Sequence, residues 1–153
     1  MLEIANKTKQ KINRQAAIAL TDYVLRFYKK EKLEVSLVII GDKKMQALNY
    51  QFRGLDKTTD VLSFPGATGK SKMPASAPDF LGEIFINIQE AARGSRYQEM
   101  FGERKTPTYI FYFLLVHGLL HLLGYDDKNE SGRRAMIILG TNFLGGFFLD
   151  KVL

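Results

Sequence analysis

The stretch from Tyr109 to Asp127 constrains the fold more than any other part of the chain. It is the most apolar segment, and it contains both histidines of the protein, His117 and His121. Histidines four residues apart lie one turn apart on the same face of a helix. Gly124 follows the apolar run where a glycine commonly ends a helix, so we expect the chain to turn back there. The two aspartates that close the stretch then come within reach of the histidine face.

This arrangement predicts a metal site with three protein ligands. His117, His121 and Asp127 offer two imidazole nitrogens and a carboxylate oxygen, which are common zinc donors. The carboxylate would make a weaker Lewis acid than three histidines, and it could shift preference toward harder ions such as manganese. Two alternatives stay open: both histidines could be satisfied core residues, and Asp126 or Asp127 could cap the next helix. The His-Glu-x-x-His peptidase pattern is absent, since Gly118 stands where its general base would be.

Length and composition indicate one globular domain over residues 1–153. The chain is 46% hydrophobic and 25% charged, and it is long enough to bury a core. It has no cysteine, which excludes disulfides and thiolate metal sites. The first residues lack the order of a secretory signal, and the apolar runs are shorter than the roughly 20 residues that a bilayer needs. We therefore expect a cytoplasmic protein without a membrane partner.

Basic residues point to a second functional feature. The formal net charge of +6 suits a polyanionic partner such as nucleic acid, although the lysines and arginines are scattered. Arg53 could grip a phosphate bidentately and stabilise the charge that develops in phosphoryl transfer. Lys57 lies in the same turn-rich segment. Taken alone, both residues are most simply exposed turn cations. Ser63 has no histidine nearby in sequence, so we do not interpret it as a nucleophile.

The order of the remaining segments predicts an α+β fold. A mixed sheet with helices packed on it is favoured over a doubly wound fold, and no glycine-rich phosphate loop follows a strand. The segment 67–79 has no apolar period and is interpreted as a flexible flap or a variable insertion. We expect strands at 2–5, 35–40, 59–64 and 80–88, and helices at 13–32 (capped by Asn13), 43–51, 89–100, 109–123 and from 130 to 143 or beyond.

Three blocks of the sequence, taken together, resemble the YbeY family of bacterial rRNA maturation endoribonucleases. The matching spacings extend the resemblance over nearly the whole chain, and the combination is specific although no single block is. In the block that contains Glu83, the family usually has Asp at that position. The blocks are His117-Gly-Leu-Leu-His121-Leu-Leu-Gly124-Tyr125-Asp126; then Leu48-Asn49, Arg53-Gly54 and Thr59-Asp60-Val61-Leu62-Ser63-Phe64-Pro65; and Leu81-Gly82-Glu83-Ile84.

The resemblance implies a metal-dependent, single-strand-specific endoribonuclease that acts in 16S rRNA 3′-end maturation and ribosome quality control. Its partners would be ribosomal RNA and the small ribosomal subunit. The implied fold has about four strands, with the metal-binding helix behind the sheet in a zincin-like arrangement. His117 and His121 would hold one zinc ion, and Arg53, with Lys57 nearby, would contact RNA phosphate.

One departure from the family pattern leaves more than one function open. The family has a third histidine six residues after the second, where this chain has Asp127, and Thr58 replaces a usual proline. The favoured hypothesis is a metal-assisted endoribonuclease whose nucleophile is water or a ribose 2′-OH. The alternative is a ribosome-assembly factor that binds RNA without cleaving it. A third hypothesis is a metallohydrolase with a different substrate, because metal chemistry alone does not select RNA.

Overall fold

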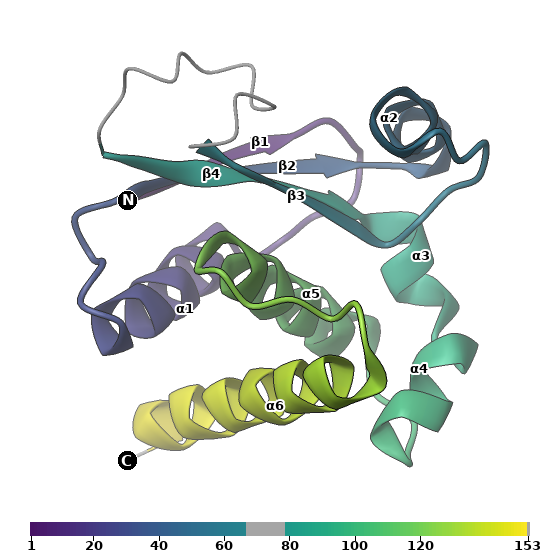
Figure 1. The fold of residues 1–153 in the computed structure, drawn as a ribbon. Helices are drawn as coiled ribbons and strands as arrows, with labels where there is room; N and C mark the ends of the chain where they lie inside the picture. The colour runs from purple at the N-terminus through teal and green to yellow at the C-terminus, as the bar shows by residue number, and fades with distance from the viewer. Residues whose placement is uncertain (67–78, 153) are drawn as a thin grey trace.

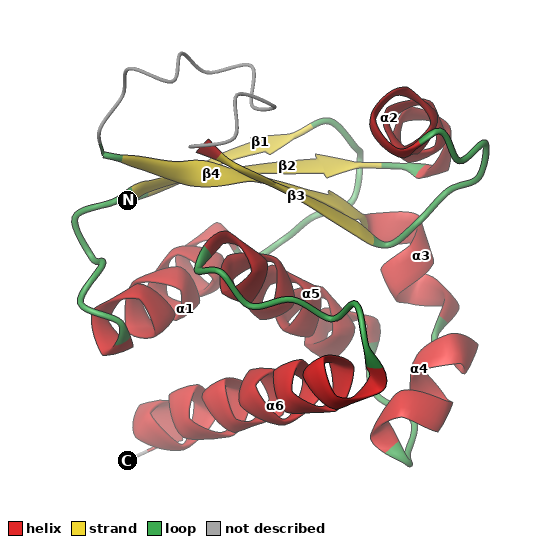
Figure 2. Ribbon diagram, viewed as in Figure 1, coloured by secondary structure: helices red, strands yellow, loops and turns green. Residues whose placement is uncertain are grey.

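The computed structural model describes residues 1–66 and 79–152, in which helices cover a four-stranded sheet (Figures 1 and 2). The strand order is β1-β2-β4-β3. β1, β2 and β4 are parallel to one another, whereas β3 runs antiparallel to β4. This confirms the predicted α+β fold with a mixed sheet. The strands are β1 (Leu2–Asn6), β2 (Glu34–Ile40), β3 (Val61–Pro65) and β4 (Phe80–Asn87).

Three of the helices form layers on one face of this sheet. α5 packs directly against β3 and β4, and α6 covers the other side of α5. α1 lies beside them, while α2 lies on the opposite face of the sheet (Figure 1). The helices are α1 (Arg14–Phe27), α2 (Asp42–Arg53), α3 (Ile88–Arg93), α4 (Ser95–Phe101), α5 (Pro107–Leu122) and α6 (Glu130–Val152).

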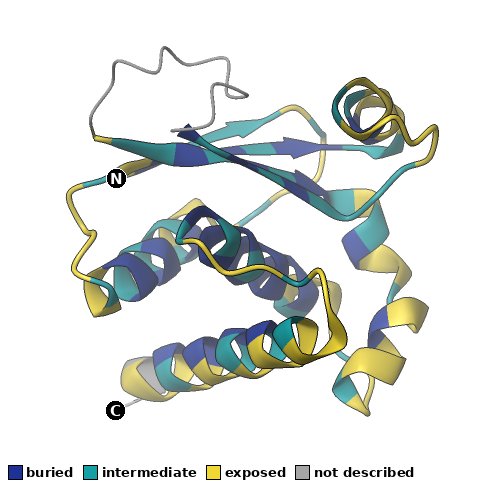
Figure 3. Cartoon of the chain, viewed as in Figure 1, coloured by how far each residue is buried: buried dark blue, intermediate teal, exposed yellow. Residues whose placement is uncertain are grey.

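The position of α5 follows from its composition. A helix that is apolar on all sides has to be covered on all sides, and α5 is the most continuously buried helix in Figure 3. Thr106 caps its start, because its hydroxyl oxygen accepts the Tyr109 backbone N–H at 3.1 Å, and Pro107 occupies the first turn. Within the described residues, every helix falls short of the length or the apolar character needed to cross a bilayer.

A smaller apolar cluster holds α2 on the opposite face of the sheet. Met45 of α2 is fully buried there against Ile40 of β2 and against Leu62 and Phe64 of β3. The Phe52 and Phe64 rings also touch, with centroids 4.8 Å apart. This packing fixes the C-terminal end of α2 beside β3, and so determines where Arg53 emerges.

The first helix begins as predicted and ends earlier. Asn13 caps α1, accepting the Ala16 N–H at 3.0 Å, but the helix stops at Phe27 instead of continuing to Lys32. Lys29 adopts a left-handed backbone with φ of 57°. Its N–H and that of the next residue bond back to the carbonyls of residues 26 and 25, which is a Schellman helix end.

The predicted helix over 89–100 is wrong in one respect, since it consists of two helices. Gly94 separates α3 from α4 with φ of 62°, which a helix interior cannot accommodate. The residues on either side of Gly94 are compatible with one continuous polar helix, so the sequence pattern did not reveal the division. The prediction for 67–79 falls almost wholly on residues 67–78, which lie outside the described part of the chain.

Candidate metal centre

The three predicted ligands converge at the C-terminal end of α5. The Nε2 atoms of His117 and His121 are 3.1 Å apart. Oδ2 of Asp127 lies 3.2 Å from the first of these nitrogens and 3.5 Å from the second. Asp126 takes another role: it is exposed, and its carboxylate accepts the Lys128 backbone N–H at 3.1 Å. Of the two aspartates, Asp127 is therefore the one that faces the histidines.

A tight helix end brings this carboxylate back. Gly124 has φ of 103°, a conformation that favours glycine, and its N–H bonds to the His121 carbonyl at 3.0 Å. The Tyr125 N–H bonds to the Leu120 carbonyl at 3.0 Å, which completes a Schellman motif. The turn predicted at Gly124 is thus confirmed, and it also orients a ligand. The Tyr125 carbonyl lies 3.1 Å from Nδ1 of His121, so Nδ1–H can donate to it and leave Nε2 free to coordinate.

The triangle of facing atoms fits a metal ion. Tetrahedral bonds of about 2.0–2.1 Å place neighbouring ligand atoms about 3.3 Å apart, close to the three separations observed. With the His121 proton on Nδ1, its Nε2 can only accept. The Asp127 carboxylate also accepts, and a single proton on His117 Nε2 cannot satisfy both neighbours at once. A cation between the three atoms would satisfy all of them.

Burial keeps His117 suited to this role. Removal from water, followed by the charge of His121, lowers the pKa of His117 below its ordinary value. The ring therefore stays neutral near pH 7, which is the form that binds metals. Phe113 stacks beside it, with centroids 5.9 Å apart. The Nδ1 atom of His117 is buried and has no hydrogen-bond partner among the described residues.

A cleft of about 440 Å³ opens over the triangle. Arg53, at the C-terminal end of α2, lines this cleft and has an exposed side chain. Lys57 is exposed too, but it does not line the cleft. The structure thus brings Arg53 together with the three ligands and leaves Lys57 outside. The remaining wall comes from residues 59–63 and Pro65, in and before β3.

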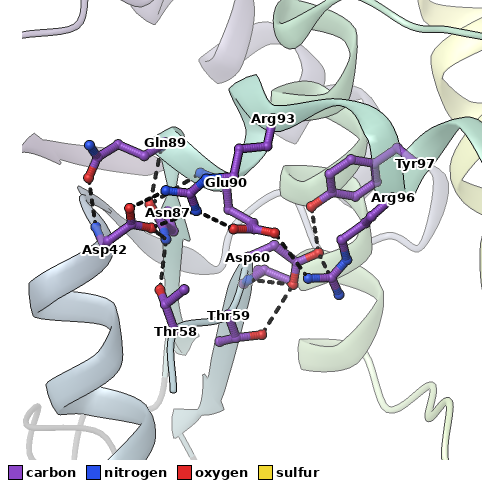
Figure 4. A network of polar contacts seen from close by, with 11 residues as sticks. Asp42, Thr58, Thr59, Asp60, Asn87, Gln89, Glu90, Arg93, Arg96 and Tyr97 are labelled. Carbon is purple, nitrogen blue, oxygen red and sulfur yellow. Dashed lines mark hydrogen bonds and ion pairs between the residues drawn. The ribbon is translucent and has the colours of Figure 1, made fainter. Parts of the chain in front are cut away.

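Two polar residues of that wall were not recognised as site residues from the sequence. Ser63 lines the cleft, and its hydroxyl donates to the Gly118 carbonyl at 3.4 Å. Asp60 also lines the cleft and accepts the Tyr97 hydroxyl at 2.7 Å and the Val61 N–H at 2.8 Å (Figure 4). Burial raises the pKa of Tyr97, so its phenol remains a donor. The alternation of β3 could have placed Ser63 opposite the buried Leu62 face.

A polar network anchors the segment that precedes this wall (Figure 4). Asn87, fully buried at the end of β4, donates to Asp42 of α2 at 2.8 Å and to the Thr58 hydroxyl at 2.9 Å. Its own oxygen accepts the Gln89 N–H at 3.1 Å, which caps α3. Arg93 pairs with Asp42 from the outside. Thr58 thus accepts a side-chain hydrogen bond that a proline at this position could not.

Comparison with known proteins decides the family. The sequence profile of the family described as Endoribonuclease YbeY matches residues 3–146. The chain belongs to the YbeY family. A Pelotomaculum thermopropionicum protein named endoribonuclease YbeY is 39% identical over 121 residues, which cover 79% of this chain and 76% of the relative. An Anaeromyxobacter protein with the same name is 41% identical over 103 residues, covering 67% of this chain and 48% of that relative.

A solved structure agrees with the fold. The solution structure of a Thermotoga maritima protein superposes with a TM-score of 0.59 and covers 98% of this chain and 91% of its own. Its sequence identity is 23%, so this likeness concerns the fold alone. The comparisons confirm the resemblance to the YbeY family, and the superposition supports the predicted α+β architecture. The aligned region spans about half of the Anaeromyxobacter relative's length.

Proposed function

We propose that this chain is a metal-dependent endoribonuclease that cuts single-stranded RNA, with His117, His121 and Asp127 holding one zinc ion. The observation that carries the proposal is the triangle of facing acceptor atoms beneath an open cleft. A divalent ion bound there would polarise a phosphodiester oxygen and lower the pKa of nearby water. Another divalent metal, manganese among them, remains compatible with the Asp127 oxygen.

Arg53 is the proposed catalytic and RNA-binding cation. Its side chain lines the same cleft and forms no ion pair with a described residue, so it is available to a phosphate. A guanidinium can donate two parallel hydrogen bonds to phosphate oxygens and stabilise charge that develops there. Lys57 lies outside the cleft, where it could attract the RNA backbone without touching the scissile phosphate.

The cellular role is proposed from the family. We infer that the RNA is ribosomal, that the cut belongs to 16S rRNA 3′-end maturation and ribosome quality control, and that the small ribosomal subunit presents it in the cytoplasm. The net charge of +6 supports a polyanionic partner. Neither water nor a ribose 2′-OH is favoured as nucleophile by the described residues.

A second candidate function rests on the third ligand. Asp127 replaces the family's histidine, and its side chain is 37% exposed, so water can compete for its oxygen. A protein with a weakened metal site could still bind RNA as a ribosome-assembly factor without cleaving it. Asp127→His separates the two functions. If this variant gains metal and cleavage activity relative to the wild type, the wild-type site is degenerate and the assembly factor is favoured.

The direct test is cleavage of one labelled RNA in single-stranded and duplex form, with metal content measured on the same protein. We expect the wild type to cut the single strand and His121→Ala to lose both the metal and at least about 100-fold in rate. Asp126→Asn is the matched control, since it changes an acid beside the triangle without removing a ligand. Equal cutting by wild type and His121→Ala would refute the assignment.

A further inference from the structure

Three aromatic side chains form an exposed patch next to the candidate metal centre. This aromatic patch consists of Phe27 and Tyr28, from the end of α1, and Tyr125, from the turn after α5. Phe27 is 70% exposed and Tyr125 37% exposed. The Phe27 and Tyr28 rings have centroids 5.1 Å apart, and those of Tyr28 and Tyr125 6.1 Å apart. Phe143 of α6 supports the patch from below, 5.2 Å from Phe27.

Two helix ends fix the geometry of this patch. α1 closes with a Schellman motif at Lys29, and α5 closes with another at Gly124. The two ends meet where the Tyr28 hydroxyl donates to the Tyr125 hydroxyl at 3.1 Å. Lys29 holds a left-handed backbone conformation that is unfavourable for a residue with a side chain. The backbone positions that carry the rings are therefore fixed by hydrogen-bonded helix ends on both sides of the patch.

The turn that follows α5 contributes residues to both the aromatic patch and the candidate metal centre. Tyr125 contributes its ring to the patch, and its carbonyl oxygen lies 3.1 Å from Nδ1 of His121. Asp127, whose carboxylate completes the triangle, follows two residues later. None of the three patch residues lines the cleft, so an RNA strand would have to extend beyond the cleft, along the turn after α5, to reach the patch.

The charge around the patch suits a polyanion. The segment from Arg26 to Lys32 contains four Lys or Arg residues and one acidic residue. Lys128, three residues after Tyr125, adds a cation, and its backbone N–H donates to the carboxylate of Asp126. Arg26, Lys29, Lys30 and Lys128 form no ion pair with any residue in the described ranges, so their charges remain available to phosphates.

We propose that the aromatic patch is a stacking subsite for an unpaired base of the RNA substrate, an inference that rests on the proposed function. Exposed rings stack bases of any identity, whereas neighbouring cations hold the backbone. A paired base is enclosed in its helix and cannot reach Phe27 or Tyr125. The subsite thus provides a physical reason for preferring single strands: the strand that presents its phosphate to the cleft must also offer a free base.

The first test measures binding of a short labelled single-stranded RNA by fluorescence anisotropy. We expect Phe27→Ala to weaken binding by about fivefold or more, the lower end of what a stacked base contributes. Phe27→Trp should retain binding, because an indole also stacks. Phe148→Ala is the matched control, as Phe148 is an exposed aromatic of α6 outside the patch. The dependence on salt should be the same in all variants, since no phosphate contact is removed.

The second test uses the absence of tryptophan from the natural chain. The indole introduced by Phe27→Trp is then the single tryptophan, and its fluorescence should be quenched when a base stacks on it. An RNA of the same length with abasic positions should bind through its phosphates and leave the fluorescence unchanged. Quenching that is equal with the abasic strand would overturn the subsite.

The outcomes separate this inference from the function on which it rests. If wild type binds and cuts RNA and Phe27→Ala does the same, the stacking subsite is wrong while the endoribonuclease proposal stands. If wild type neither binds nor cuts any RNA, both fail. If Phe27→Ala changes the sedimentation of the protein alone and leaves RNA binding unchanged, the patch is a contact between copies of the chain, and the subsite is again wrong.

Discussion

Gly118 lies so close to Ile84 that a Cβ on the glycine would be 2.8 Å from the Ile84 Cγ2 atom. The helix that carries the histidines is thereby pressed against β4 at the residue after His117. In His-Glu-x-x-His peptidases this position holds the catalytic glutamate. Here it faces the sheet core, so a glutamate would have neither room nor access to the cleft. The contact explains why peptidase chemistry by that route is not available to this chain.

Replacing this glycine should destabilise the fold. Overpacking a core costs about 1–3 kcal/mol, whereas a helical Gly→Ala change returns about 1 kcal/mol. We expect Gly118→Ala to lower the free energy of unfolding by about 1 kcal/mol. Urea denaturation followed by circular dichroism measures it.

Gly145→Ala provides the control of opposite sign. Gly145 is exposed in α6, and a Cβ there would meet nothing within 4 Å. Only the helix propensity then applies, and stability should rise by about 1 kcal/mol. Equal stabilisation by both alanines would show that α5 does not pack against Ile84 as described.

The Asp127 carboxylate should contribute strongly to metal affinity. Asp127→Asn removes the negative charge of the side chain and keeps its shape. We expect zinc to bind at least about tenfold more weakly, because replacing a residue that merely orients a metal ligand already costs about tenfold in metal affinity. Competition with a chromophoric chelator measures the affinity. Asp126→Asn should bind zinc as the wild type does. Unchanged affinity in Asp127→Asn would exclude this residue from the ligand set.

Arg53 should affect cleavage without affecting the metal. We expect Arg53→Ala to lower kcat/KM for single-stranded RNA by about 10²–10³, as for removal of a group that stabilises developing charge. Arg53→Lys should restore part of this, since an ammonium lacks the bidentate geometry. Lys57→Ala should weaken binding mainly at low salt. Wild-type kinetics in Arg53→Ala, at equal metal content, would contradict the proposed role.

Acid should weaken the network around Asn87 through Asp42. Hydrogen bonds from Arg93, then from Asn87, hold the pKa of Asp42 below its ordinary value. Because the pKa of Asp42 is lowered in the folded state, its contribution to stability is fully present above the pKa of the unfolded state, about 3.9. That contribution is lost as the pH falls through the lower pKa of the folded state.

The matched variant makes this dependence measurable. Asp42→Asn should be less stable than wild type at pH 7, by no more than about 1 kcal/mol because the pair is partly exposed. The difference should shrink as the pH falls below about 3.9, where the unfolded state takes up the proton, and it should vanish below the lowered pKa of the folded state. Chemical denaturation at several pH values measures it, and a constant difference down to pH 2 would contradict the assignment.

Local sequence patterns were sufficient for the core of the candidate site. His117 and Asp127 are separated by ten positions. Helical spacing and one glycine turn therefore brought the ligands together without reference to the rest of the fold. The apolar composition of α5 likewise determined that it would be buried. The division of 89–100 at Gly94 was missed, because a single glycine in a polar segment leaves the helical period intact.

Only the tertiary structure decided what surrounds the ligands. Arg53 reaches the cleft because β3 pairs antiparallel with β4 and α2 packs on the opposite sheet face, and Lys57, four residues further on, does not line it. Tyr28 meets Tyr125 across 97 residues of sequence. The local sequence pattern specifies the geometry of a single helix and of the turn that ends it. The distances between elements depend on how apolar faces pack together, which no local pattern specifies.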